Sequence, residues 1–184
     1  MKPLNFTLPT WLEDFKKNQT NGFLSDETQI SLAIELARLN VQHSTGGPFG
    51  AAIFDDNGQL ISTGVNIVES ACCSILHAEM VAIALAQQQL KTFSLGSTGT
   101  LYTIATSAEP CAMCYGAIPW SGISKVIFAA NSSDVESIGF DEGDKPKEWI
   151  SCYKKRGIHV VPELQREAGK RPLLDYLKSK GTIY

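Results

Sequence analysis

Four side chains in two short stretches of the sequence could carry out metal chemistry. His77 and Glu79 lie two positions apart, and Cys111 and Cys114 lie three apart, directly after Pro110. An imidazole and two thiols are good zinc donors. A catalytic zinc keeps three protein ligands, whereas a structural zinc usually has four. The pattern therefore predicts a catalytic Zn²⁺, one per chain, held by the histidine and the two cysteines.

Two other interpretations use the same residues. Cys72 or Cys73 could supply a fourth ligand and make the zinc structural. Glu79 would then be a buried carboxylate with no chemical role to offset the cost of its burial. A redox-active dithiol made of the two later cysteines would leave His77 unexplained. The combination of both motifs favours the catalytic site.

Glu79 is the candidate catalytic residue of this site. Zinc lowers the pKa of a bound water from about 15.7 to about 7, which provides hydroxide near neutral pH. We expect Glu79 to take the proton of the water, deliver it to a ring nitrogen of the substrate and help to protonate departing ammonia. The predicted chemistry is replacement of an amino group on a heterocycle by a carbonyl.

Two predicted helices position these groups. The stretch from near His77 to about Gln89 is apolar nearly all round, which is typical of a buried helix. Pro110 favours the first position of a helix, so Cys111 and Cys114 are expected in its first turn, on one face. The positive end of that helix favours the thiolate forms that bind metal.

Short apolar runs and turn residues predict the remaining elements. Strands are expected over 51–54, 60–65, 101–106, 125–129 and 158–161. Asn57-Gly58 favours a hairpin between the first two strands. Further helices are expected over 10–17, 25–42 and 131–138, and in the tail beyond Pro162 with a break at Pro172.

Strands that alternate with helices after an opening hairpin predict an α/β protein. We expect a three-layer α/β/α fold with a mixed five-stranded sheet. Residues 1–24 are interpreted as an N-terminal arm, 25–162 as the main domain and 163–184 as a C-terminal helical tail.

Composition narrows the protein class. The chain has 184 residues, and its 43% hydrophobic content is enough for a core. No apolar run is long enough to span a bilayer, and the N-terminus has no apolar core of signal-peptide length, so we expect no membrane partner and a cytoplasmic protein. An odd number of cysteines, five, favours metal binding or free thiols over a disulfide framework.

Charge is distributed unevenly. The net charge is −3, with −8 over residues 1–143 and +5 over residues 144–184. The acidic body argues against a nucleic-acid partner, although the basic tail keeps RNA as an alternative. A solvated helical face explains the tail more simply.

Beyond the metal motifs, the chain resembles the bacterial guanine deaminases of the cytidine-deaminase fold over roughly residues 25–184. Pro119 and the long N-terminal arm depart from the shorter family members. The resemblance is carried by Gly46-Gly47-Pro48-Phe49, Asn66, His77-Ala78-Glu79, Ser107 to Cys111, Cys114, Gly116-Ala117-Ile118, Trp120 and Ile138 to Glu142.

The resemblance implies a set of substrate-binding residues. Asn66 would hydrogen-bond the purine, Phe49 and Trp120 would help to form its pocket, and Tyr184 would close it. Ala78, within the metal motif, is also expected at the substrate. On composition alone, Phe49 and Trp120 would be core residues, and Asn66 could simply close a turn.

The resemblance also implies a second acidic group and a dimer. Glu142 would be a second catalytic residue that contacts the substrate and assists proton transfer, with Asp141 as the alternative. Without the resemblance, both would belong to a solvated loop. Family members form homodimers that can exchange C-terminal segments, here residues 163–184.

The predicted function is zinc-dependent hydrolysis of guanine to xanthine and ammonia, in purine catabolism. The alternatives are deamination of cytosine, cytidine, guanosine or a guanine-like triazine such as ammeline. A tRNA adenosine deaminase and a zinc-binding module without catalysis are more distant alternatives.

Overall fold

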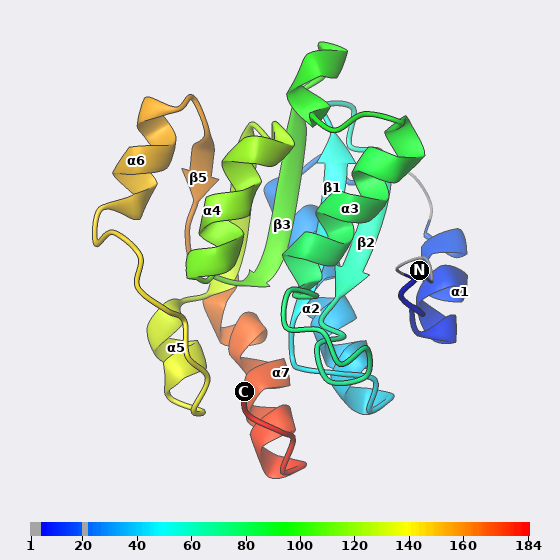
Figure 1. Cartoon of the computed structure of the whole chain (residues 1–184), viewed down its shortest axis with the longest axis vertical. Helices are drawn as coiled ribbons and strands as arrows, with labels where there is room; N and C mark the ends of the chain where they lie inside the picture. The colour runs from blue at the N-terminus through cyan, green and yellow to red at the C-terminus, as the bar shows by residue number, and fades with distance from the viewer. Residues whose placement is uncertain (1–4, 20–21) are drawn as a thin grey trace.

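A mixed five-stranded sheet between two layers of helices forms the centre of the computed structural model (Figure 1). The structure describes residues 5–19 and 22–184. The strand order is β2-β1-β3-β4-β5. The expectation of a three-layer α/β/α fold with five strands is confirmed.

The opening hairpin consists of β1 (Gly50–Asp55) and β2 (Leu60–Val65), which pair in antiparallel fashion. Asp55 holds the turn, because its Oδ1 accepts hydrogen bonds from the backbone of Asn57 (3.0 Å) and Gln59 (2.8 Å). Gly58 has φ +73°, a left-handed conformation that suits glycine. The predicted hairpin and its Asn-Gly turn are confirmed.

The other half of the sheet is parallel. β3 (Tyr102–Ala108) pairs antiparallel with β1 and parallel with β4 (Lys125–Ala130), which pairs parallel with β5 (His159–Val161). Helix α4 (Ala112–Ser121) makes the crossover from β3 to β4. The carboxyl end of β3 therefore leads straight into the cysteine motif.

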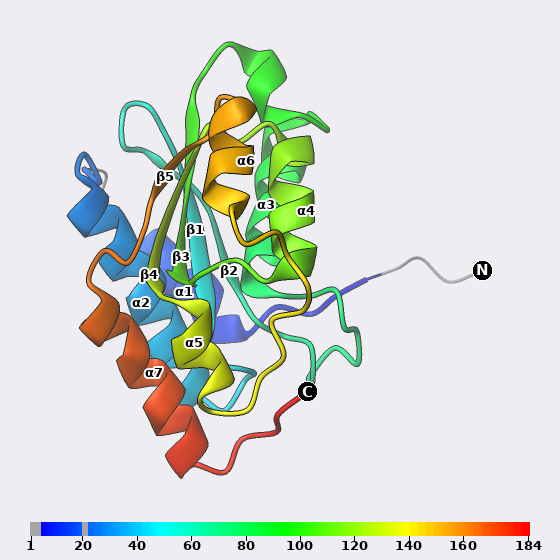
Figure 2. The same cartoon turned by 90° about the vertical axis from the view of Figure 1, so that its left-hand side faces the viewer.

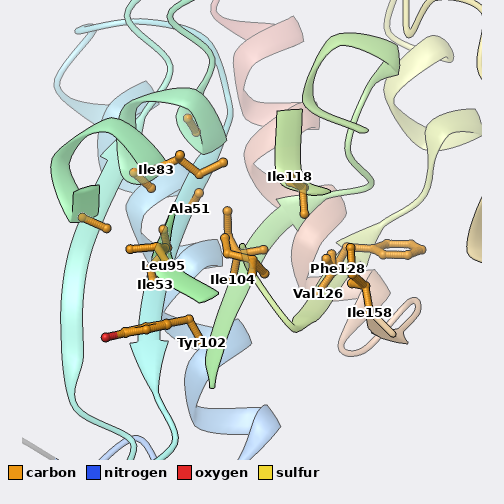
Figure 3. Close-up of a cluster of buried hydrophobic side chains, with 14 of the residues drawn as sticks. Ala51, Ile53, Ile83, Leu95, Tyr102, Ile104, Ile118, Val126, Phe128 and Ile158 are labelled. Carbon is orange, nitrogen blue, oxygen red and sulfur yellow. The ribbon is translucent and has the colours of Figure 1, made fainter. Parts of the chain in front are cut away.

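Three helices cover the face of the sheet seen in front in Figure 1: α3 (Ala78–Leu90), α4 and α6 (Trp149–Lys155). Their apolar side chains share one cluster with the sheet (Figure 3). Labelled members of this cluster are Ala51, Ile53, Ile83, Leu95, Tyr102, Ile104, Ile118, Val126, Phe128 and Ile158. Helix α6 was not predicted from the sequence.

Helices α2 (Asp26–Gln42) and α7 (Arg166–Lys178) cover the opposite face (Figure 2). Ser25 caps α2 by accepting a hydrogen bond from the backbone of Thr28. The predicted break at Pro172 is wrong, because α7 continues through this residue. Pro172, Leu173 and Tyr176 are all buried, so packing offsets the backbone hydrogen bond that a proline removes.

The predicted helix over 10–17 is confirmed as α1 (Thr10–Lys17), which docks beside the hairpin. Trp11 donates to Thr45 Oγ1 (3.1 Å) and stacks on His43, while Lys16 donates to the Ile61 carbonyl (2.7 Å). Residues 1–4 and 20–21 of the predicted arm lie outside the described residues. The three-part division of the chain and the exchange of residues 163–184 stay predictions.

Two short helices complete the fold: η1 (Leu95–Thr98) and α5 (Ser132–Glu136). A capping box of Asn131 and Asp134 begins α5, within the predicted helical range. Among the described helices, none has the length and apolar character needed to cross a membrane.

Candidate active site

The three predicted metal ligands lie at the first residues of two neighbouring helices. His77 is the N-cap of α3, and Cys111 is the N-cap of α4, with Cys114 in the first turn. The two helices lie side by side in front of the sheet (Figure 1). The prediction that Pro110 takes the first helical position is wrong by two residues, because Cys111 still has extended backbone angles (φ −64°, ψ 174°) and the helix begins at Ala112.

The distances between the donor atoms fit a tetrahedral zinc ion. His77 Nδ1 lies 3.5 Å from Cys111 Sγ and 3.8 Å from Cys114 Sγ. Zinc bonds of about 2.3 Å to sulfur and about 2.0 Å to nitrogen place tetrahedral donors about 3.6 Å apart. The three side chains are therefore already arranged as a three-ligand zinc site.

The electrostatics of the two thiols also suit a cation. The hydrogen bond from Cys114 and the neighbouring His77 lower the pKa of Cys111 to about 4, against the opposing effect of burial. The same bond and burial raise the pKa of Cys114. The pair thus offers one thiolate and one thiol that a bound metal would deprotonate.

The structural-zinc alternative lacks its fourth ligand. Among the residues that the structure describes, the potential metal group at this place has three members: His77, Cys111 and Cys114. Cys72 is exposed and Cys73 half-buried. Neither lines the cavity beside the metal ligands.

A cavity of about 310 Å³ opens beside the metal ligands. It gathers most of the predicted site residues, although they come from six different segments of the chain. The lining consists of Phe49, Gly50, Asn66, Val68, Ser74, His77, Glu79, Thr106, Ser107, Ala108, Glu109, Cys111, Phe140, Asp141, Glu142 and Tyr184.

Two buried carboxyl groups lie in this cavity. Glu79, in the first turn of α3, is 8% exposed, and Glu142 is 7% exposed. Burial and the Cys111 thiolate raise the pKa of both, that of Glu142 to about 8, against the lowering effect of Lys145 on Glu142. Asp141 is exposed and accepts a hydrogen bond from the Gly143 backbone (2.8 Å). Of the two neighbouring acidic residues, Glu142 is thus buried and Asp141 exposed.

Asn66 supplies the polar end of the cavity. Its side-chain Oδ1 accepts hydrogen bonds from Tyr184 Oη (2.5 Å) and from the Val68 backbone (3.2 Å). These bonds fix the orientation of the amide, which leaves Nδ2 to donate to a ligand. Gly47 makes room for this arrangement, because a Cβ there would lie 2.6 Å from Tyr184 Oη.

Aromatic rings form the apolar wall. Phe49 contacts Phe140 edge to face with ring centroids 5.1 Å apart, and Phe140 contacts Tyr184 in the same way at 5.3 Å. The predicted Phe49 and Tyr184 therefore lie on the same wall, because Phe140 packs between them. Phe140 itself was not predicted to bind substrate; only the acidic residues that follow it were. The three rings could stack on or border a planar heterocycle.

Two predicted substrate-binding residues do not line the cavity. Trp120 is 81% exposed, six positions after Cys114 near the far end of α4, or about 9 Å along the helix axis. Trp120 thus lies outside the cavity of the single chain, and its role in the pocket stays a prediction. Ala78 is fully buried at the start of α3 between His77 and Glu79, behind the cavity surface.

Sequence reasoning missed an ion pair at the cavity. Glu109 lines it and pairs with Lys145 at 2.6 Å. Glu109 stands directly before the cysteine motif, which is the one signal that could have drawn attention to it. Lys145 carries no such signal, because its partner is distant in sequence.

Comparisons with known proteins agree with the fold and the metal ligands. Residues 24–130 match the family model described as the cytidine and deoxycytidylate deaminase zinc-binding region. A guanine deaminase of Bacillus subtilis (strain 168) is 39% identical over 131 residues, which cover 68% of this chain and 81% of that protein. A probable cytosine deaminase of Schizosaccharomyces pombe is 36% identical over 153 residues, 80% of this chain and 86% of that protein.

A solved structure covers nearly the whole chain. That of a guanine deaminase from Nitrosomonas europaea superposes with a TM-score of 0.90 at 40% identity, over 96% of this chain and 97% of that one. The chain belongs to the cytidine and deoxycytidylate deaminase family of zinc-dependent hydrolases. The predicted family resemblance, enzyme class and zinc cofactor are thereby confirmed.

Proposed function

We propose that this enzyme hydrolyses guanine to xanthine and ammonia. The observation that carries the proposal is the pairing of two buried carboxyl groups, Glu79 and Glu142, in one cavity with the metal ligands. The similarity to guanine deaminases over most of the chain supports the choice of substrate. A volume of about 310 Å³ is at the small end for ligand pockets, which suits a single base.

The metal side of the cavity would activate water. When bound by His77, Cys111 and Cys114, zinc supplies a hydroxide near neutral pH by lowering the pKa of a coordinated water to about 7. Glu79 lies in the same helical turn as His77 and accepts the proton of the attacking water. Its raised pKa, caused chiefly by burial, makes it a better base than an exposed glutamate.

The opposite side would hold and protonate the base. Asn66 Nδ2 donates to an acceptor on the purine, while Phe49 and Phe140 contact its ring faces and edges. Glu142, protonated at neutral pH, donates a proton to the departing amine. Tyr184 covers the outer edge.

The reaction balances with these groups. A bond forms between the water oxygen and C2 of guanine, and the bond from C2 to the amino nitrogen breaks. Glu79 carries one water proton to the ring nitrogen next to C2. Glu142 gives its proton to the amine, which leaves as ammonia, and the other water proton restores Glu142, so the products are xanthine and ammonia.

Ammonia release by the purified zinc protein tests the proposal. Guanine, guanosine, cytosine, cytidine, adenine and ammeline would be compared in parallel, with Glu79→Gln as the inactive control. Release from guanine alone is expected. Release from another compound would keep the chemistry and refute the substrate, and silence on all with zinc present would favour a binding module.

We further propose a cytoplasmic homodimer that acts in purine catabolism. The family resemblance supports the dimer, and the 81% exposed Trp120 and 65% exposed Leu101 give the surface apolar area that a partner chain could cover. Light scattering should give twice the chain mass of 20.0 kDa. A mass of one chain at micromolar concentration would contradict the dimer.

A further inference from the structure

A nearly buried ion pair beside the cavity has no part in the mechanism above. Lys145 Nζ lies 2.6 Å from Glu109 Oε1, and the two side chains are 10% and 11% exposed. The ammonium also donates to the Pro110 carbonyl (2.8 Å) and to Ser132 Oγ (2.9 Å). It thus has an acceptor for each of its three protons, which fixes its position.

The contacts of Lys145 join several segments that meet at the cavity. Glu109 and Pro110 come directly before the metal ligand Cys111, and Ser132 begins α5. Lys145 itself lies in the loop that carries Glu142, and its ammonium stands 5.4 Å from the ring centre of Trp149 at the start of α6. The Lys145 ammonium therefore connects its loop to the segment before α4, to α5 and to α6.

One of these partners, Ser132, reaches Glu142. Ser132 donates from its backbone to Glu109 Oε2 (3.1 Å) and has its hydroxyl 3.5 Å from Glu142 Oε2. On the other side, the backbone of Ala112, which follows Cys111, donates to the Glu142 carbonyl (2.9 Å). The carboxyl group of Glu142 is thus reached from Lys145 through a single side chain.

We propose that Lys145 is a positioning residue, which holds the Glu142 carboxyl group in the cavity through Ser132 and by neutralising Glu109. The proposal rests on the proposed proton-donating role of Glu142. Without the ammonium, Glu109 would be an unpaired buried carboxylate on the same cavity wall as Glu142. The Ser132 hydroxyl would also lose its donor and be free to turn.

The first test replaces the cation. In Lys145→Met, kcat for guanine should fall about 10- to 100-fold with KM within about threefold, because substrate binding is left to other residues. Lys147→Met is the matched control on the same loop, where the side chain is exposed, and it should leave kcat unchanged. Loss of zinc from Lys145→Met would instead indicate a structural role through Glu109 and Cys111, and would overturn the proposal.

A double-mutant cycle separates positioning from a general effect. In the Glu142→Gln background, Lys145→Met should lower kcat by less than about twofold further, since its target is gone. If the kcat losses of Lys145→Met and Glu142→Gln multiply in the double variant, the positioning role of Lys145 is overturned, while the proposed role of Glu142 is unaffected. Full activity of Glu142→Gln alone would refute the proposed role of Glu142 itself, and inactivity of the wild type on guanine would refute the proposed substrate.

A second variant guards against misfolding of the first. Glu109→Gln removes the charge but keeps an oxygen that can accept from Lys145, so the local packing is retained. It should lower kcat in the same direction by a smaller factor, and this loss should also vanish in the Glu142→Gln background. An unchanged kcat in Glu109→Gln together with an unchanged kcat in Lys145→Arg and Lys145→Met would overturn the proposal.

Discussion

The two sides of the cavity are built in different ways. On the metal side, His77, Cys111 and Cys114 occupy the first residues of two core helices, and the apolar faces of these helices are packed against the sheet. On the closing side, Glu142 comes from a loop and Tyr184 from the segment after α7, both outside helices and strands. The metal side depends on secondary structure, and the closing side on individual contacts.

This difference separates the residues that activate water from those that hold and protonate the substrate. Residues at the starts of packed helices can move little without unfolding the core. Residues in loops can be replaced at small cost to stability, so they are suited to select a ligand. Substitutions on the metal side should therefore act on turnover or zinc, and those on the closing side on pH dependence or KM.

Glu79→Gln should have the largest effect. It removes the base next to the metal ligands, so kcat should fall about 100- to 10,000-fold, while zinc stays near one per chain because the three ligands are intact. Steady-state ammonia release and metal analysis measure both quantities. Turnover of Glu79→Gln near that of the wild type would contradict the assignment of water activation to the metal side.

Glu142→Gln should change the pH profile. The pKa of Glu142 is raised to about 8, so the wild-type carboxyl is protonated at neutral pH, and kcat should fall as the pH rises through this value and the proton is lost. The variant should be about 10- to 100-fold slower at neutral pH and lack this alkaline limb. Rates from about pH 6 to about pH 10 test it, and an alkaline limb that survives the substitution would contradict the assignment.

Tyr184→Phe should have a smaller effect, confined to KM. The substitution removes the hydrogen bond to Asn66 Oδ1 but keeps the ring contact with Phe140. A lost hydrogen bond of about 1 kcal/mol corresponds to about a fivefold rise in KM, with kcat within about twofold. Initial rates over a range of guanine concentrations distinguish this from a loss of turnover, which would place Tyr184 in the chemistry.

Trp120→Ala should leave kcat and KM within about twofold of the wild type. Trp120 is 81% exposed and does not line the cavity. Kinetics together with light scattering measure catalysis and assembly separately. A large rise in KM in a protein that is still dimeric would show that Trp120 serves a partner's pocket.

The metal side could be predicted from sequence because its information is local. Two motifs name the ligands, and the apolar pattern of α3 and the proline before Cys111 place them at helix starts. The hairpin was predictable for the same reason, since Asn57 and Gly58 fix its turn. The error in the start of α4 is two residues, since the helix begins at Ala112 and not at Pro110.

The closing side could not be predicted in this way. Two of its contacts join residues far apart in the chain: Lys145 with Glu109, and Tyr184 with Asn66. No local sequence pattern predicts either contact. The direction in which Trp120 points depends on the rotation of α4, which the motif does not fix. Of the residues that the resemblance indicates, Asn66 and Glu142 line the cavity, whereas Trp120 does not, and their roles stay predictions.

Two helices show how packing overrides local signals. Helix α6 has only seven residues, so its buried Trp149 and Tyr153 make too short a pattern to be read as helical. Helix α7 contains Pro172, which predicts a break, yet Leu173 and Tyr176 pack into a buried cluster and the helix continues. In both cases tertiary contacts decide the structure.

The close approach of Gly47 to Tyr184 has a consequence for how this family can vary. A methyl group at position 47 would lie 2.6 Å from the tyrosine hydroxyl, so any side chain at 47 would force Tyr184 out of its present position. The two positions should therefore change together among relatives: a residue larger than glycine at one should coincide with loss of the tyrosine at the other. We expect relatives whose pocket is closed by a residue other than tyrosine to accept a different base.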